Sequence, residues 1–330
     1  MRPLKLQKCY QARFSPDGRF LLSISRDVNL WSLADGKKLW RAHPFSHPAD
    51  IEFSPDGSKL ALKSTSGRIV SLETAAGRLL IDYGNRLEGE GCNACFSASG
   101  EELIDGAWSG LLSVRHAHTG EGLFRRHFDG EMICRVLYPS CRSFFITEQK
   151  PKATTSNGPP ENGYFLKWAW PFESRDPLRL PFSFPFLRSS SLSPCGGKMA
   201  VVHGAPPREM VVLNVNSGKK LWSKAVDLGG SGNEICWSSC GSMIAAVQRN
   251  RIAIYNAANG SYLGSRHFEF PSSVDFSSDG SLVAFGDWSH GLVETFDPDK
   301  LDKDAELPVT GPRTLEELIA SLGSSGPARL

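Results

Sequence analysis

The stretch FSPDGRFLLSISRDVNLWSLADGKKLW, residues 14–40, alternates short apolar runs with tight turns. Its first five residues, FSPDG, return unchanged at 53–57, and its last six nearly recur as SGKKLW at 217–222. Ser-Pro-Asp-Gly predicts a hairpin turn, because Pro presets φ, Asp bonds its own backbone and Gly tolerates a positive φ. The repetition indicates one structural unit used several times.

Related pentapeptides occur seven times along the chain. Each begins with an aromatic residue or Leu, continues with Ser or Pro and two small or polar residues, and usually ends in Gly. The first residues of these copies, called anchors below, are Phe14, Phe53, Phe96, Tyr138, Leu192, Trp237 and Phe276. Successive anchors lie 39, 43, 42, 54, 45 and 39 residues apart. A step of about 44 residues is typical of one four-stranded blade.

Within one unit, the pattern predicts four short strands. A strand ends at Phe14, RFLLSIS and VNLWSL follow the first turn, and KKLW opens a fourth strand after the turn ADG. A single sheet of this kind would leave its faces unburied, so several must pack around an axis. We therefore predict an all-β fold, a seven-bladed β-propeller of four-stranded antiparallel blades, forming one domain over residues 1–300.

These features resemble the WD40-like β-propeller family. The resemblance covers residues 10 to about 300 and rests on the FSPDG turn, the sevenfold recurrence and an aromatic residue in the third strand, as at Trp31, Tyr255 and Phe296. The chain resembles a divergent member, because Ser32 follows Trp31 where the family has Asp, and no repeat has the family's Gly-His pair. The resemblance implies the propeller fold.

Two segments depart from the regular repeat. The last unit offers three strands, and the alternating segment 3–9, PLKLQKC, is expected to close the ring as the fourth; the alternative is 305–310, in which Pro308 is unfavourable. The long fourth step matches an insert at 149–163, QKPKATTSNGPPENG, which is expected to form a surface loop or a peptide arm that orders on binding.

Composition narrows the range of functions. The chain has 330 residues, is 40% hydrophobic and carries a formal net charge of +2, which gives no electrostatic reason to expect nucleic acid. No stretch is apolar and long enough to span a membrane, and the N-terminus lacks an apolar signal core. We expect a cytoplasmic protein with no membrane partner.

Cysteine and histidine patterns do not predict a metal site. Cys92 and Cys95 form a CxxC, but Cys95, Cys134 and Cys236 fall in predicted first strands of the repeats and are interpreted as small buried hydrophobic residues. Cys195 and Cys240 take the Asp position of the turn. His116 and His118 share a strand face without a third ligand nearby. We predict no metal and no cofactor.

The sequence lacks the common catalytic motifs. It contains no G-x-S-x-G, no H-E-x-x-H and no phosphate-binding glycine loop. We expect a non-catalytic scaffold that binds a protein or peptide. The alternative is an enzyme or small-ligand binder, of hydrolase or lactonase type, with a site at the central axis. Acidic residues or histidines with perturbed pKa values converging on the axis would favour this alternative.

One face of the predicted ring carries the irregular loops, because turns between second and third strands and connections between units fall on the same side. This loop-rich face is the predicted partner site. Trp and Arg are over-represented at interface anchors, and the candidates on this face are Arg26, Trp108, Arg208, Arg249 and Trp288. For Trp108 and Trp288, packing at the blade ends is the alternative role.

The tail, residues 301–330, departs from the repeat. Thr314 as an N-cap and Glu317 three residues later predict a helix over 314–322. Its apolar stripe is expected to dock on the propeller or in a partner's groove; it consists of Leu315, Leu318, Ile319 and Leu322.

Overall fold

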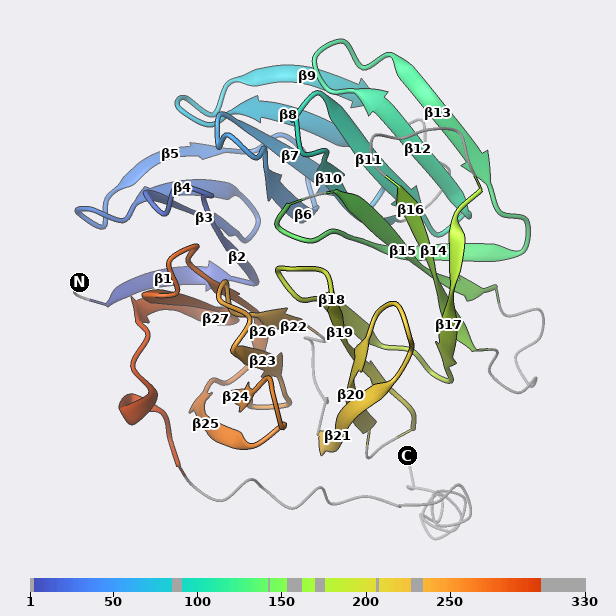
Figure 1. Cartoon of the computed structure of the whole chain (residues 1–330). Coiled ribbons are helices and arrows are strands. Elements are labelled where there is room, and N and C mark those ends of the chain that lie inside the picture. Colours follow the sequence, from blue (N-terminus) through green and yellow to red (C-terminus); the bar gives the residue numbers. More distant parts are fainter. Residues whose placement is uncertain are drawn as a thin grey trace, which may run out of the picture.

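The computed structural model describes residues 3–84, 91–141, 143–152, 162–169, 176–205, 208–226 and 234–303. Seven antiparallel sheets are arranged in a ring, and in six of them the first strand lies nearest the middle (Figure 1). The predicted seven-bladed propeller is confirmed. The only helix in this part of the chain is a short 3-10 turn, η1 (Pro298–Lys300), so no described helix is long and apolar enough to cross a membrane.

Six blades are each built from four consecutive strands. Blade 1 contains β2 (Gln11–Phe14), β3 (Phe20–Ile24), β4 (Val28–Ser32) and β5 (Lys38–Ala42). Blade 2 contains β6 (Pro48–Phe53), β7 (Lys59–Ser64), β8 (Ile69–Glu73) and β9 (Leu79–Gly84). Blade 3 contains β10 (Gly91–Phe96), β11 (Glu102–Ala107), β12 (Leu111–His116) and β13 (Gly122–His127).

The other three of these six follow the same plan. Blade 4 contains β14 (Glu131–Leu137), β15 (Phe144–Pro151), β16 (Gly163–Ala169) and β17 (Leu178–Phe184). Blade 5 contains β18 (Ser189–Leu192), β19 (Lys198–His203), β20 (Arg208–Asn214) and β21 (Lys220–Val226). Blade 6 contains β22 (Ile235–Trp237), β23 (Met243–Val247), β24 (Arg251–Asn256) and β25 (Tyr262–His267).

Blade 7 joins the two ends of the described chain. It contains β26 (Pro271–Phe276), β27 (Leu282–Thr295) and β1 (Leu4–Cys9), in the order β1-β27-β26. The first part of β27 pairs with β26 and the second with β1, so β27 supplies both middle strands, which the sequence predicted separately at 281–285 and 291–296. The segment expected to close the ring thus lies against the last blade (Figure 1).

The recurring pentapeptide forms the turn between the first two strands of a blade. In blade 2 the hydroxyl of Ser54 donates to Asp56 at 2.6 Å and accepts from the backbone N–H of Lys59 at 2.9 Å. Gly57 ends the turn with a φ of 72°. The same bonds recur around Ser15 in blade 1 and Ser277 in blade 7, which explains why the sequence repeats.

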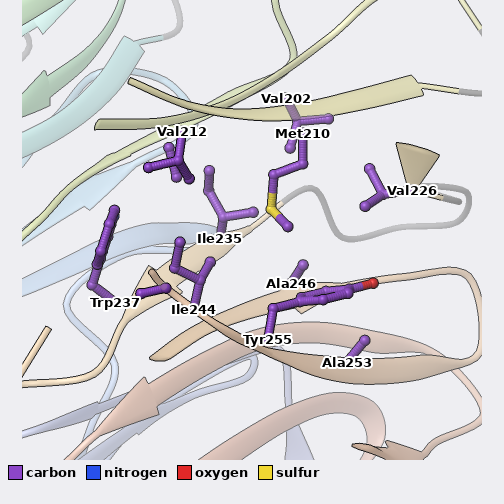
Figure 2. Packing of buried hydrophobic residues seen from close by; sticks show 12 residues of the cluster. Val202, Met210, Val212, Val226, Ile235, Trp237, Ile244, Ala246, Ala253 and Tyr255 are labelled. Carbon is purple, nitrogen blue, oxygen red and sulfur yellow. The ribbon is translucent and has the colours of Figure 1, made fainter. Parts of the chain in front are cut away.

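Neighbouring blades are held together by apolar clusters. Between blades 5 and 6, Val202, Met210 and Val212 pack against residues of β22 to β24, including Ile244 and Tyr255 (Figure 2). The repeated KKLW motif contributes to this packing, because Trp222 Nε1 donates to the carbonyl oxygen of Ala257 at 3.0 Å. The equivalent Trp40 in blade 1 donates to Thr74 of blade 2 at 2.8 Å.

Two predictions about irregular segments have different outcomes. The loop expected over 149–163 is shorter than predicted, because residues 149–151 continue β15 and Gly163 begins β16. Gln149 pairs with Tyr164 and with Ile133 of β14, so strand pairing extends into the Pro-containing segment. Residues 153–161, the predicted tail helix over 314–322 and the alternative closing segment 305–310 lie outside the described residues.

Candidate functional site

The inner strands present two polar tiers to the axis. Side chains two positions apart share one face of a strand, and in every blade at least one of the residues one and three positions before the anchor lines the axial cavity. The tier one position before the anchor contributes Arg13, Glu52, Leu137, Ser191, Cys236 and Asp275 to the cavity lining. The tier three positions before it contributes Gln11, Asp50, Asn93, Arg135 and Glu234.

These tiers enclose an axial chamber of about 510 Å³. Tyr10 and Trp288 also line it, and Trp288 borders two recesses on the loop-rich face, so this pair marks the rim of the chamber. Their rings stack with centroids 4.8 Å apart. Four inner strands, β6, β10, β14 and β26, have a register shift near their first residues, and such bulges re-aim side chains near functional sites.

Polar contacts link different blades across the chamber. Arg13 of blade 1 forms an ion pair with Glu234, just before β22 of blade 6, at 2.5 Å between Nη2 and Oε1. The hydroxyl of Tyr138 in blade 4 donates to Glu52 of blade 2. Because each bond joins blades that are not neighbours in the ring, the network ties the inner strands together around the axis.

Two carboxyl groups in the chamber are partly desolvated. Asp50 accepts a hydrogen bond from Gln11 Nε2 at 2.9 Å, and Asp275 accepts one from the backbone N–H of Phe14 at 2.9 Å. Burial raises the pKa of Asp50 to about 6 and that of Asp275 also to about 6, although nearby Arg13 acts in the opposite direction on both. At neutral pH both groups are mainly ionised, at an energetic cost that a bound cation would offset.

The charge of Arg13 is the counterpart of these carboxylates. Burial on its own would lower the pKa of Arg13, but Glu234, Asp275 and Asp50 outweigh burial and raise it. Arg13 therefore stays charged and anchors the acidic groups. The other guanidinium group in the lining belongs to Arg135 of β14. Four carboxylates thus face two guanidinium groups, and the chamber has an excess of negative charge.

Some cysteines of the inner strands are not buried hydrophobic residues. Cys95 is fully buried, as predicted, whereas Cys134 and Cys236 are half-buried and line the chamber. They reach it because β14 is bulged next to Cys134 and because Cys236 falls in the tier one position before the anchor. Burial raises the pKa of Cys134 to about 12 and that of Cys236 well above its usual value.

No metal-binding group exists among the residues that the structure describes. Cys195 and Cys240 lie exposed in the turns of blades 5 and 6, within 3.5 and 3.4 Å of Ser193 and Ser238, at the predicted Asp position. The His116 and His118 rings lie 5.6 Å apart. Lys59 contacts His118 at 3.1 Å, so a cation already occupies the space beside that ring.

The structure brings together two of the five residues predicted on the loop-rich face. Arg26 and Trp288 line the same two recesses, because ring closure makes blades 1 and 7 neighbours. Trp108 follows β11 in blade 3, Arg208 begins β20 in blade 5, and Arg249 follows β23 in blade 6. Trp108 is 40% and Trp288 48% exposed, so neither is fully covered by packing at its blade end.

The chamber residues were not predicted from the sequence as a site. A usable signal existed. When the copies are aligned on their anchors, charged residues such as Arg13, Glu52 and Asp275 recur in columns that alternate along the strand with mainly apolar columns. In an inner strand buried on both faces, the side chains of both faces would be apolar. The alternation therefore marks an axial face that contacts solvent or a ligand.

Comparison with known proteins supports the fold and nothing narrower. No protein-family model and no curated protein matches the sequence. Among solved structures, the chain is similar to hydrazine synthase from Kuenenia stuttgartiensis, with 13% identity over 89% of this chain and 97% of that chain, and a TM-score of 0.72. A likeness at this identity shows a shared β-propeller fold, and membership of the WD40-like family stays a prediction.

Proposed function

We propose that this propeller binds a small organic molecule carrying an ammonium group in its axial chamber. The observation that supports the proposal is the chamber's charge, since Asp50, Glu52, Glu234 and Asp275 outnumber the guanidinium groups beside them. Carboxylate oxygens in a partly desolvated cavity attract a cation more strongly than they would in water. This replaces the expectation of a purely scaffolding role as the first candidate function.

The pairing inside the chamber leaves carboxylates for a ligand. Arg13 is engaged by Glu234, whereas Asp50 receives its hydrogen bond from the neutral amide of Gln11. The raised pKa values of Asp50 and Asp275 mean that their ionised forms are disfavoured by burial. A bound ammonium group would stabilise the ionised carboxylates, and this stabilisation would contribute to the free energy of binding.

Size and shape agree with a small molecule. A volume of about 510 Å³ falls within the roughly 300–1,000 Å³ common for ligand pockets. At the rim, the stacked rings of Tyr10 and Trp288 offer aromatic faces that favour a passing cation. Arg135 could hold a hydroxyl or carboxylate on the same ligand.

Binding without catalysis is part of the proposal. The thiol beside the carboxylates, Cys236, has a raised pKa and hence little thiolate to act as a nucleophile. The alternative of a hydrolase at the axis would need a second activated group near Asp275, such as a general base held against a nucleophile.

The test is a calorimetric titration of the full chain with amines at neutral pH. Putrescine and L-lysine are suitable probes, with 1,4-butanediol as the uncharged counterpart of putrescine. The amines are expected to bind and the diol is not. In the double variant Asp50→Asn/Asp275→Asn, amine affinity should fall by roughly tenfold or more, because removing one charge of a pair costs over ~1.4 kcal/mol.

A matched control is Asp35→Asn, which changes an exposed aspartate in a turn of blade 1. It should bind amines like the original protein. If no amine binds, or if the chamber variant binds as tightly as the control, an ammonium-binding function is wrong.

A second function, binding of a protein partner on the loop-rich face, is favoured by one specific observation. Arg26 and Trp288, both exposed, line the same two recesses at the junction of blades 1 and 7. Exposed Trp and Arg side chains gathered at one place are typical of interface anchors. Trp288→Ala should abolish capture of such a partner while leaving folding intact.

A further inference from the structure

The junction of blades 7 and 1 forms a basic groove on the loop-rich face. The groove has a volume of about 890 Å³ and lies between β1 and the strands β4 and β5. Its lining contains five cationic side chains from three separate segments, and only one carboxylate. The cations are Lys5, Lys8, Arg26, Lys38 and Arg41.

The single carboxylate is already paired. Asp27 forms an ion pair with Arg41 at 2.6 Å and contacts His43 at 3.2 Å. Lys38 lies over the Trp31 ring, 4.9 Å from its centroid.

Three cations of the groove remain available. Lys5, Lys8 and Arg26 are exposed and have no anionic partner in the part of the chain that the structure describes. The basic groove therefore presents a surplus of positive charge to solvent.

Lys8 has an unusual backbone conformation that bears on the groove. Its φ is 39°, in the left-handed region, and the pairing of β1 with β27 shifts register between Gln7 and Cys9. A bulge of this kind redirects a side chain out of the regular alternation. As a result, Lys8 lines both the basic groove and the recess beside it.

The neighbouring recess, called the apolar recess below, has a volume of about 570 Å³. Tyr10, Pro48 and Ala49 contribute to its wall, and Trp288 lines both this recess and the basic groove. The stacking of Trp288 on Tyr10 holds the indole in place, so its position is set before a partner arrives.

We propose that the basic groove and the apolar recess together bind an acidic peptide segment that carries an apolar side chain between its carboxylates. The carboxylates would lie along Lys5, Lys8 and Arg26, and the apolar side chain would enter the apolar recess against Trp288. This rests on the second proposed function, because it names the chemistry of the partner on that face. It shares Tyr10 and Trp288 with the rim of the axial chamber but uses none of the chamber's carboxylates.

Charge distribution favours a peptide over nucleic acid. The net charge of the chain is only +2, and the surplus cations lie at one junction between two blades. A nucleic-acid surface usually needs a basic stripe that follows many phosphates. An acidic peptide needs a few cations beside an apolar pocket, and these two features are adjacent here.

The experiment measures fluorescence anisotropy of a labelled peptide of alternating Glu and Asp with one central Leu, added to the full chain at low salt. The same peptide with Lys in place of each acid is the charge-reversed probe, and a labelled oligothymidylate is the nucleic-acid probe. The acidic peptide should bind, more weakly as salt is added, and the other two probes should not compete with it.

Two variants separate the parts of the proposal. Lys8→Gln/Arg26→Gln neutralises two exposed cations and should weaken the acidic peptide by roughly tenfold. Lys219→Gln neutralises an exposed lysine of the blade 5 turn and should leave binding unchanged. Asp50→Asn should also leave it unchanged, which distinguishes this site from the chamber.

Several outcomes would overturn the proposal. These are no binding of the acidic peptide, equal binding by the neutralised variant, or tighter binding of the oligothymidylate. If Trp288→Ala weakens a peptide whose binding does not respond to Lys8→Gln/Arg26→Gln, the face still binds a partner but the acidic class is wrong.

Discussion

At the scale of single residues, the fold depends on a few hydrogen bonds repeated in the turns. Ser54 is 1% exposed, and its hydroxyl ties the Asp56 carboxylate to the start of β7. Asp56 also accepts from the backbone N–H and the hydroxyl of Ser58, at 3.0 and 2.7 Å. The carboxylate adds these bonds to the turn's own backbone bond from Gly57 N–H to the Ser54 carbonyl oxygen at 2.8 Å, which explains why Asp recurs at this position.

Replacing Asp56 tests the contribution of this turn and its pH dependence. Burial opposes ionisation of Asp56, but the hydrogen bonds from Ser54 and Ser58 outweigh it and lower its pKa to about 2. A lowered pKa in the folded state means that the stabilisation is complete above the ordinary value near 3.8 and is lost as pH falls toward 2. Asp56→Ala should reduce the free energy of unfolding by about 2 kcal/mol at pH 7.

Urea unfolding at pH 7 and pH 2.5 gives this free energy, and the difference between the variant and the original protein should shrink at the lower pH. Asp129→Ala is the control, because that side chain is 98% exposed; it should change stability by less than about 0.5 kcal/mol. An equal loss for Asp56→Ala at both pH values would contradict the role of its ionised form.

Residue identities also explain what the sequence could not reveal. The prediction of buried cysteines was right for Cys95, which packs in an apolar cluster with Ile104 and Leu112. It was wrong for Cys134 and Cys236, because a local bulge and the axial tier expose them to the chamber. The sequence alone does not show bulges, since they depend on how a strand pairs with its neighbour.

At the scale of elements, blades meet through residues of the outer strands as well as the core. Trp222 in β21 packs on Gly260 in the turn before β25, and a Cβ added to Gly260 would lie 2.7 Å from Trp222 Cε3. Trp40 and Gly77 repeat this contact between blades 1 and 2, with a Cβ distance of 2.8 Å. The near-copy of KKLW in the sequence thus reflects a shared contact between neighbouring blades.

Gly260→Ala should destabilise the protein by about 2 kcal/mol, because the added methyl group meets Trp222 and the residue has a φ of 73°. Gly130→Ala is a matched control with a φ of 75° and no atom within 4 Å of the added Cβ, so it isolates the backbone strain. Thermal unfolding compares the two variants. Equal losses of stability in the two variants would show that the close approach of the added methyl group to Trp222 carries no cost.

Elements were predicted well where turns mark them, and less well where pairing decides them. Every anchor lies at or next to the end of an inner strand, from β2 to β26, as the pentapeptide predicts. The ends of the insert were wrong, because the hydrogen bonds between β15 and β16 continue beyond the apolar residues that a sequence pattern detects. The two middle strands of blade 7 form one element, β27, because strand pairing continues from its contact with β26 to its contact with β1.

At the scale of the whole molecule, ring closure creates the surface features that no segment has by itself. β1 brings Lys5 and Lys8 from the beginning of the chain beside Trp288 near its end. The inner strands likewise bring Asp50 and Asp275, 225 positions apart in sequence, into one chamber. Of the predicted face residues, Arg26 of blade 1 and Trp288 of blade 7 are brought together by closure.

Function was harder to predict than fold because the chamber is assembled from small groups of residues contributed by every blade. No local motif contains Arg13, Asp50, Glu234 and Asp275, although Arg13 and Asp275 share one place within their repeats and Asp50 and Glu234 share another. Patterns along the chain detect turns and strands, whereas this site appears only when the repeats are superposed and the ring is closed.

The measurement that tests the central claim most directly is the affinity of the full chain for putrescine at pH 8 and at pH 5. The pKa of Asp50 and that of Asp275 are both raised to about 6. Below pH 6 protons therefore compete with the ligand, whereas above pH 6 the carboxylates are ionised. The amine should bind more tightly at pH 8, with protons released on binding near pH 6. Equal affinity at both values, or tighter binding at pH 5, would contradict an acidic axial chamber as the ligand site.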